Sequence, residues 1–224
     1  MIAYPTKPQY TADDLAAIIA ILRDPQNGCP WDKVQTHASI RMNFLEEAYE
    51  AVDAIDLDDP HLLCEELGDV LMQVVFHAQI EAEAGRFTWQ QVCDGVCRKL
   101  IARHPHIFGG DDSIKDWDAL KNKEKGRLTL QDDLASVPQA LPALMRAAKL
   151  QKRAARYGVR VAADAQQIAR QAQALQQVQG GPAAQAAGEL LFAAVALARQ
   201  AGVDPEQALQ QYNAGFAQAE PQNR

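Results

Sequence analysis

The stretch FLEEAYEAVDAIDLDDPHLLCEELGDVLMQVV, residues 44–75, decides the fold because it predicts two helices joined by a short turn. Apolar residues recur every three or four positions on both sides of the turn, as they do on the buried face of a helix. Asp59 followed by Pro60 is a typical helix start, since aspartate caps the first free N–H groups and proline fits the first helical position. So short a turn predicts that the two helices pack antiparallel.

The same two helices carry acids whose spacing of three or four residues places them on shared helix faces. The acids of the two helices lie at similar distances from the turn, so they are expected to face one another. Converging carboxylates repel unless cations lie among them, and their oxygen atoms suit Mg²⁺ or Mn²⁺. Other acids, including Glu81 and Glu83, are interpreted as a solvent-exposed helix face. The converging acids are Glu46, Glu47, Glu50, Glu66 and Asp69.

Helical periodicity continues through most of the chain, and no convincing alternating strand pattern is found, so an all-α fold is predicted. The stretch from Gly126 to Pro138 is less regular. The expected helices cover approximately residues 11–23, 38–57, 60–84, 88–104, 114–125, 139–156, 164–179, 182–201 and 205–219.

An internal repeat links two distant segments. GDVLMQVVFHAQ, which begins at Gly68, is similar to GELLFAAVALAR, which begins at Gly188, at an offset of 120 residues. The second copy keeps the apolar pattern and loses nearly all the acids, so these helices do not need the acids in order to pack. The positions of the second copy where an acid is replaced are Gln166, Gln167, Arg170 and Ala186.

The repeat predicts two domains, residues 1–126 with the intact acidic motif and residues 138–224 with the degenerate one, joined by a linker at 127–137. Residues 1–125 carry 12 Lys and Arg against 22 Asp and Glu, whereas residues 126–224 carry 10 against 7. The halves are therefore expected to do different jobs. We expect the second copy to bind no Mg²⁺ and to stabilise or dimerise the protein. An alternative is a regulatory nucleotide site in which Arg170 contacts phosphate.

The composition argues against several classes of protein. The net charge is −7 and no basic stripe is present, which disfavours nucleic-acid binding. No uninterrupted apolar run approaches the roughly 18 residues of a membrane helix, and the N-terminus lacks a signal-peptide pattern. A soluble cytoplasmic protein is expected. The four cysteines contain no C-x-x-C pair, so reduced thiols are favoured over a zinc site.

Several segments together resemble the MazG family of all-α nucleoside triphosphate pyrophosphohydrolases, whose acidic signature has the form E-E-x-x-E followed by E-x-x-D. The resemblance covers about residues 22–200. The matching segments are LRDPQNGCPWDKVQTH (22–37), FLEEAYEAVDAI (44–55), ELGDVLMQVVFHAQ (66–79), GRFTW (85–89), RHPHIF (103–108) and LPALMRAAKLQKRAARYG (141–158).

The resemblance implies Mg²⁺-dependent hydrolysis of a nucleoside triphosphate to the monophosphate and pyrophosphate, and a homodimer. It implies that Glu46 places or deprotonates the attacking water. The metal ligands that it implies are Glu47, Glu50, Glu66 and Asp69. Phosphates also need cations, and bases need flat partners for stacking. The candidates for these substrate contacts are Lys33, Lys99, Arg103, Lys121, Trp31 and Trp117.

Two alternatives remain open from the sequence. One is a pyrophosphohydrolase dedicated to a single substrate such as dUTP, dCTP or phosphoribosyl-ATP, against which the GCPWDKVQT segment counts. The other is a non-catalytic helical adaptor, against which the intact acidic set counts. Base preference and the number of metal ions do not follow from the sequence.

Overall fold

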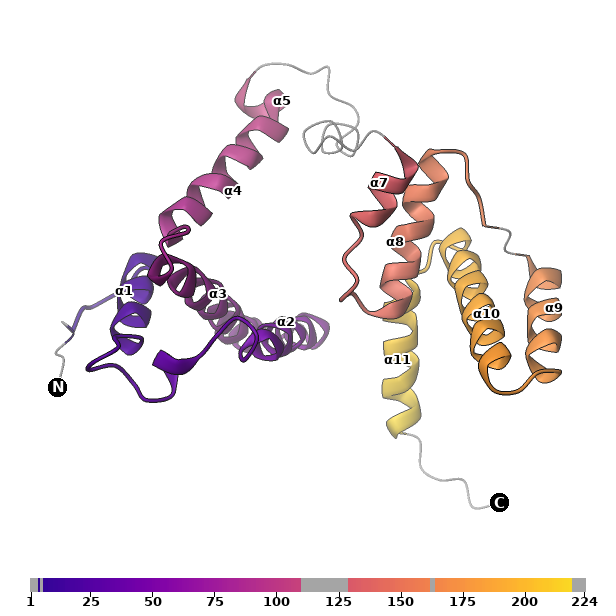
Figure 1. Ribbon diagram of the computed structural model, residues 1–224, viewed down its shortest axis with the longest axis horizontal. Helices are drawn as coiled ribbons and strands as arrows, with labels where there is room; N and C mark the ends of the chain where they lie inside the picture. The colour runs from indigo at the N-terminus through magenta and orange to yellow at the C-terminus, as the bar shows by residue number, and fades with distance from the viewer. Residues whose placement is uncertain (1–3, 5, 110–128, 162–163, 219–224) are drawn as a thin grey trace. The chain divides into compact units, whose positions relative to one another are not determined.

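The computed structural model describes residue 4 and residues 6–109, 129–161 and 164–218, and every regular element in these ranges is a helix, as predicted. Contacts divide the chain into two units, residues 1–114 and 115–224 (Figure 1). The helix expected at 114–125, together with Trp117 and Lys121, lies outside the described residues.

The first unit is built around two long helices that lie side by side, α2 and α3. Asp59 caps α3 as predicted, because its side chain accepts hydrogen bonds from the N–H groups of His61 and Leu62. Asp58, in the turn between the two helices, has a positive φ of 53°. The helices of this unit are α1 (Ala12–Leu22), η1 (Asp32–Val34), α2 (Arg41–Asp56), α3 (Pro60–Glu83), α4 (Trp89–Arg103) and α5 (Pro105–Phe108).

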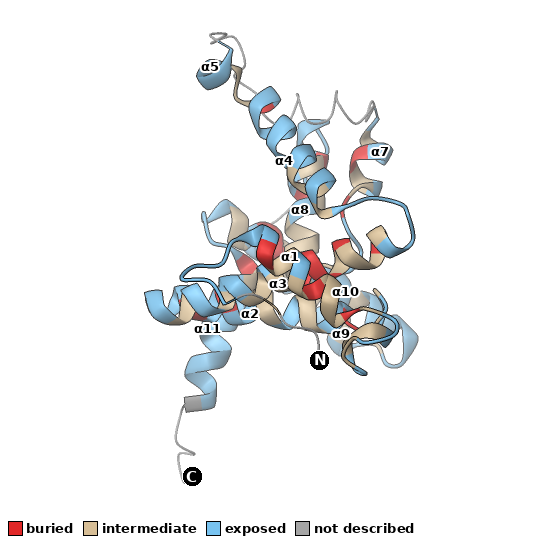
Figure 2. Cartoon of the chain, turned by 90° about the vertical axis from the view of Figure 1, so that its left-hand side faces the viewer, coloured by how far each residue is buried: buried red, intermediate tan, exposed pale blue. Residues whose placement is uncertain are grey.

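The core of the first unit lies where α1 packs on α3. Ile19 of α1, Ile40 of the following loop, and Val75 and Phe76 of α3 are buried there. Trp89 packs against this cluster and joins the start of α4 to it. The rest of α4 is mostly exposed (Figure 2). The core therefore fixes the C-terminal half of α3 and leaves the half near the α2–α3 turn for other uses.

The second unit repeats the packing order of the first. In the first unit α3 contacts α2, α1 and α4, and in the second α10 contacts α9, α8 and α11. Val137, Ala154, Ala193, Val195 and Ala196 form the buried apolar residues of this unit. The helices are α7 (Leu130–Ala135), α8 (Ala143–Arg156), α9 (Ala165–Gln176), α10 (Gly181–Gln200) and α11 (Pro205–Gln218). Helix α7 falls within the stretch treated above as a linker, and it packs on α8.

Helix α10 is the one helix, among the described residues, whose length and composition match a membrane span. The sequence shows no uninterrupted apolar run, and α10 meets the criterion on its average hydropathy instead. Length and composition do not separate such a helix from the core helix of a domain. In the fold, α10 packs on α8 and α9.

Helices α2 and α3 expose large apolar side chains in addition to their acids. A monomer in water rarely exposes contiguous apolar surface of this kind unless another surface covers it. The exposed apolar residues of these two helices are Leu45, Tyr49, Val52, Ile55, Leu67 and Leu71, with Met42 at the start of α2.

Candidate metal centre and its neighbouring loop

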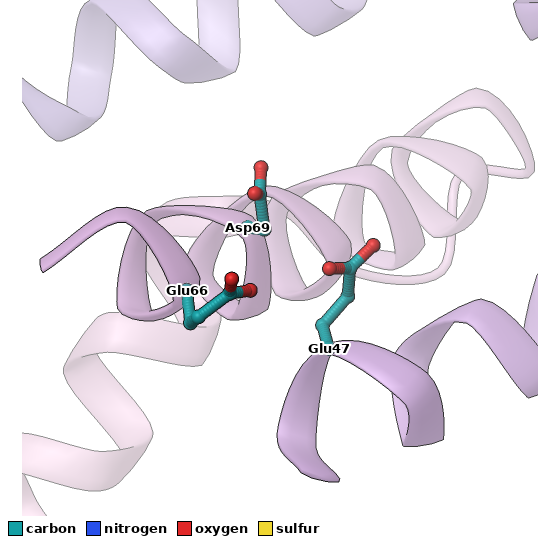
Figure 3. Close-up of side chains that lie close together, drawn as sticks. All are labelled: Glu47, Glu66 and Asp69. Carbon is teal, nitrogen blue, oxygen red and sulfur yellow. The ribbon is translucent and has the colours of Figure 1, made fainter. Parts of the chain in front are cut away.

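Three acids from the two long helices meet in the first unit. Glu66 and Asp69, one turn apart on α3, and Glu47 of α2 offer oxygen atoms that lie within 4.8 Å of one another. Figure 3 shows the carboxylates of the two helices extending into the same space. All three side chains are half-buried. The donor set consists of carboxylate oxygens only, which fits a hard divalent cation such as Mg²⁺.

Glu46 and Glu50 flank this group on α2, and both are exposed. Glu50 does not belong to the group of three whose oxygens converge. The negative charges of both residues nevertheless act on Glu47, whose pKa they help to raise. All five predicted acids thus lie close enough for their charges to affect Glu47 or Glu66, and three of them lie within reach of a single ion.

The electrostatics of the group favour a bound cation. Partial burial raises the pKa of Glu47, and the charges of Asp69, Glu50 and Glu46 raise it further. Burial also raises the pKa of Glu66, with further contributions from Asp69, Glu65 and Glu47. A raised carboxyl pKa means that the surroundings destabilise the ionised form. A bound divalent cation would stabilise that form.

A row of polar residues continues from the acids along α3 at intervals of four, which places them on one helix face. Gln73 follows Asp69, and its side-chain amide donates a long hydrogen bond of 3.4 Å to Glu47 Oε1. His77 and Glu81 follow Gln73. We did not predict this row as a unit, although its regular spacing of four residues is visible in the sequence.

His77 and Glu81 hold the loop that precedes α2. His37, near the end of that loop, stacks on His77, and the two Nδ1 atoms share a hydrogen bond of 2.7 Å. His37 Nε2 contacts Glu81 Oε1 at 2.5 Å. Arg86 donates two hydrogen bonds to the same carboxylate, and these bonds with His37 hold the pKa of Glu81 at about 2. Burial and the charge of His37 lower the pKa of His77.

The interpretation of Glu81 as a solvent-exposed acid is therefore wrong. Glu81 is buried, because Arg86 beyond the helix end and His37 from the loop both cover its carboxylate. Glu83 remains exposed but is not free, since Arg23 holds its two oxygens at 2.8 Å.

The loop between α1 and α2 is attached to α3 by His37 near its end and by Arg23 at its start. Arg23 is only 6% exposed, and its Nη1 donates hydrogen bonds to the backbone oxygens of Asp32 and Gln35. Its guanidinium also lies over the ring of Phe76, 5.0 Å from the ring centre. Gly28 turns the loop tightly, since a side chain there would lie 2.4 Å from the backbone oxygen of Asp24. The loop is thus bound to α3 at both ends.

The predicted substrate residues of this loop occupy the segment between those two attachments. Trp31 is 57% exposed, and its backbone oxygen accepts a hydrogen bond from the side chain of Gln35. Lys33 lies in η1 and is half-buried. An exposed indole on an anchored loop is available for stacking.

The two predicted cations of α4 are placed differently. Lys99 is exposed, and Arg103 is buried in the last turn of α4. Helix α4 follows the end of α3 that is opposite the α2–α3 turn (Figure 1). At a rise of about 1.5 Å per residue, Asp69 already lies about 20 Å from that end of α3. Figure 1 shows α4 leading away from α3 rather than back along it, so the first unit does not direct Lys99 and Arg103 toward its own acids.

The second unit has no comparable group of three acids among its described residues. Arg170 of α9 is exposed and donates a hydrogen bond of 2.8 Å to Gln167 Oε1. Glu189 of α10, which corresponds to Asp69 at the repeat offset, accepts a hydrogen bond from Gln185. The four cysteines of the chain are free thiols.

Comparison with known proteins identifies the family of the chain. Residues 35–108, which include all three converging acids, match the model of the MazG nucleotide pyrophosphohydrolase domain. The chain is 41% identical over 221 residues to the nucleoside triphosphate pyrophosphohydrolase of Escherichia coli K12, covering 91% of this chain and 83% of that protein. The chain belongs to the MazG family.

Two further relatives extend this finding. The nucleoside triphosphate pyrophosphohydrolase/pyrophosphatase MazG of Thermotoga maritima is 37% identical over 212 residues, which cover 92% of this chain and 82% of that protein. The nucleoside triphosphate pyrophosphohydrolase of Mycobacterium tuberculosis is 38% identical over 152 residues, which cover 65% of this chain and 46% of that protein. As a MazG family member the chain is a hydrolase, which sets aside the alternative of a non-catalytic adaptor.

Proposed function

We propose that this chain hydrolyses nucleoside triphosphates to nucleoside monophosphates and pyrophosphate with Mg²⁺, for which Mn²⁺ can substitute. The observation that carries the proposal is the convergence of Glu47, Glu66 and Asp69 from two packed helices. The names of the Escherichia coli and Thermotoga maritima relatives support the reaction. A bound divalent cation would neutralise phosphate oxygens and lower the pKa of a coordinated water.

The remaining acids of α2 have separate roles in this proposal. Glu50 completes the ligand set from the exposed side of Glu47, one turn further along the helix. Glu46 is exposed next to Glu47, where it would accept the proton of the attacking water as a general base. The protein then contributes mainly by fixing the triphosphate beside this water.

The loop between α1 and α2 would bind the rest of the nucleotide. Trp31 would stack on the base through its exposed indole, and Lys33 would contact phosphate. Stacking tolerates every base because each has a π-face, so it supplies affinity with little selectivity. This mode suits an enzyme that removes several noncanonical or damaged triphosphates from the nucleotide pool of the cytoplasm.

We also propose a homodimer. The exposed apolar residues of α2 and α3 would be covered by a second copy, which would complete a four-helix arrangement. A second copy would also bring cations to the acids, since Lys99 and Arg103 lie on a helix that leads away from the acids of their own chain. Lys121 and Trp117 remain substrate-binding candidates from the sequence alone.

Turnover assays test the reaction directly. The full chain would be incubated with the eight common nucleoside triphosphates, dUTP and ITP, with Mg²⁺ or with EDTA, and the products separated by chromatography. We expect monophosphate and pyrophosphate from several substrates, with loss of activity in EDTA and in Glu50→Gln. Asp53→Asn removes a carboxylate three residues further along α2 and should retain activity. Diphosphate and orthophosphate as products would contradict the proposed cleavage.

The same panel separates the proposal from its closest alternative. An enzyme dedicated to one substrate would turn over a single member, such as dUTP or dCTP, and leave the others intact. Adding phosphoribosyl-ATP to the panel covers the third candidate substrate.

A further inference from the structure

The second unit contains a cavity of about 460 Å³ that the acidic site does not use. It lies between α8, the end of α10 and the start of α11. Lys149, Lys152 and Arg199 line it together with the apolar side chains of Met145, Val203 and Pro205. Sites for small ligands commonly have volumes of about 300–1,000 Å³, an apolar lining and a few polar groups.

Four of the five cations of α8 fall into two classes. Arg153 and Arg156 both pair with the fully buried Asp133, at 3.2 and 3.5 Å. Lys149 and Lys152 line the cavity and make no ion pair with any described residue. The helix thus carries two arginines that pair with one buried acid and two lysines that have no acidic partner among the described residues.

Arg199 brings a third positive charge to the cavity from α10. Its Nη1 donates a hydrogen bond of 3.2 Å to Gln151 Oε1. Because this partner is neutral, the bond orients the guanidinium without neutralising its positive charge. Arg199 and Gln151 also line a neighbouring cavity of about 290 Å³, to which Arg160 adds another cation. Arg199 therefore lies between two hollows that both carry positive charge.

The acids near the larger cavity accept hydrogen bonds from backbone N–H groups. Asp204 lines the cavity and caps α11, since one of its carboxylate oxygens accepts hydrogen bonds of 3.0 Å from the N–H groups of Glu206 and Gln207. Glu206 accepts a hydrogen bond of 3.0 Å from the N–H of Met145. Three cations against a single lining carboxylate leave the cavity with a net positive charge.

We propose that this cavity binds a phosphorylated small molecule that carries two or more phosphate groups, such as pyrophosphate or a nucleotide. Phosphate oxygens would supply the negative charge that the cations lack, and the apolar wall formed by Met145, Val203 and Pro205 can contact a base. Binding requires neither a metal ion nor the acids of the first unit. Arg170, the phosphate contact considered from the sequence, does not line either cavity.

Calorimetric titration of the full chain in EDTA tests this site apart from the metal-dependent one. Pyrophosphate and ATP are the probes. We expect both to bind, and we expect affinity to fall at least about tenfold in the double variant Lys149→Gln/Lys152→Gln and in Arg199→Gln, because charge-assisted hydrogen bonds are lost. Arg170→Gln, which removes an exposed arginine of the same unit, should bind like the unaltered chain.

The outcomes separate the ligands and the sites. ATP that binds more tightly than pyrophosphate identifies a nucleotide site, and equal affinities identify a site for the phosphate groups alone. The first-unit variant Glu50→Gln should abolish turnover and leave this binding unchanged, so failure of one proposal is distinguishable from failure of the other. Absence of binding, or equal binding by the double lysine variant, overturns the inference. Both lysines are exposed, and an unchanged melting temperature would show that the variant is folded.

Discussion

The two units have the same order of packed helices but carry different chemistry on them. In each unit a long central helix contacts three others in the same sequence order. The first unit places three acids between two of these helices, whereas the second places lysines and an arginine around a cavity. The apolar pattern therefore determines how the helices pack, while residues outside the core determine which ligands each unit can bind.

Removing one converging acid should have the largest effect. We expect Glu47→Gln to lower turnover about a hundredfold or more, because the metal and the phosphate charge lose a ligand in a partly buried site. We also expect Mg²⁺ to raise the melting temperature of the unaltered chain and not that of the variant. The second unit folds without such acids, so in EDTA the melting temperature of the variant should equal or exceed that of the unaltered chain. A lower melting temperature in EDTA would mean that the acids serve the scaffold.

Removing the loop anchor should have the next largest effect. Arg23→Gln removes the hydrogen bonds of the guanidinium to Glu83 and to the backbone oxygens of Asp32 and Gln35, and should lower the free energy of unfolding by about 2–3 kcal/mol. Urea titration measures this change. Arg23→Lys is the matched control, and it should recover little because lysine cannot make the paired contact with a carboxylate. Full recovery by lysine would show that charge alone holds the loop.

His77 should make stability depend on pH, with a smaller effect. The pKa of His77 is lowered in the fold, so the unfolded chain binds more protons below its ordinary pKa of 6.5. Stability should therefore be complete well above pH 6.5 and should fall as pH drops below that value. His77→Phe should flatten this slope of melting temperature against pH. His61→Gln, which changes an exposed histidine of the same helix, should not.

Glu81 does not contribute to that slope. Its pKa is about 2, below the ordinary value of 4.5, so its stabilising contribution is present above pH 4.5 and is lost only as pH falls toward about 2. A second unfolding transition in strong acid, absent from Arg86→Gln, would distinguish the titration of Glu81 from that of His77. An identical acid transition in that variant would contradict the role given to the Arg86 pair.

Restoring acids to the second unit should have the smallest effect. In a Glu47→Gln background, Gln167→Glu, Arg170→Glu and Ala186→Glu would join Glu189 at the positions that match the first unit. We expect weak Mg²⁺ binding, which stabilises by about 0.4 kcal/mol when the ion concentration equals its dissociation constant. We expect no turnover, because only residues 157–164 join α8 to α9, whereas residues 23–40 join α1 to α2 and include the anchored loop. Thermal melts with Mg²⁺ and with Ca²⁺ measure the effect, and no response to either ion would show that the repeat offset misaligns the two hairpins.

Much of the fold follows from local signals in the sequence. Asp59 and Pro60 begin α3 as predicted, and the Thr11–Asp14 capping box begins α1. Such signals are reliable because each acts within one helical turn. The stretch 127–137 contains α7, a six-residue helix that packs on α8, although its sequence is too short to show a clear period.

The site was predictable in its ligand type and less so in its surroundings. Spacing on two helices placed Glu47, Glu66 and Asp69 together, because helix geometry fixes which positions share a face. It did not reveal that Glu81 is buried, since its partners His37 and Arg86 come from outside the helix and meet it only in the folded unit. Contacts between distant segments depend on tertiary packing, which a local pattern does not encode. Glu50 and the cations of α4 stay predictions.

Because Arg23 and His37 both attach the loop to the rest of the unit, the loop becomes ordered when the protein folds and not when a ligand binds. Fixing a residue costs about 1–2 kcal/mol of conformational entropy, and a loop ordered by its ligand loses that amount from the binding affinity. Here the guanidinium and the imidazole order the segment around Trp31 and Lys33 during folding. A nucleotide bound there, as proposed, would meet a preorganised surface, and its binding affinity would not be reduced by the cost of ordering this segment.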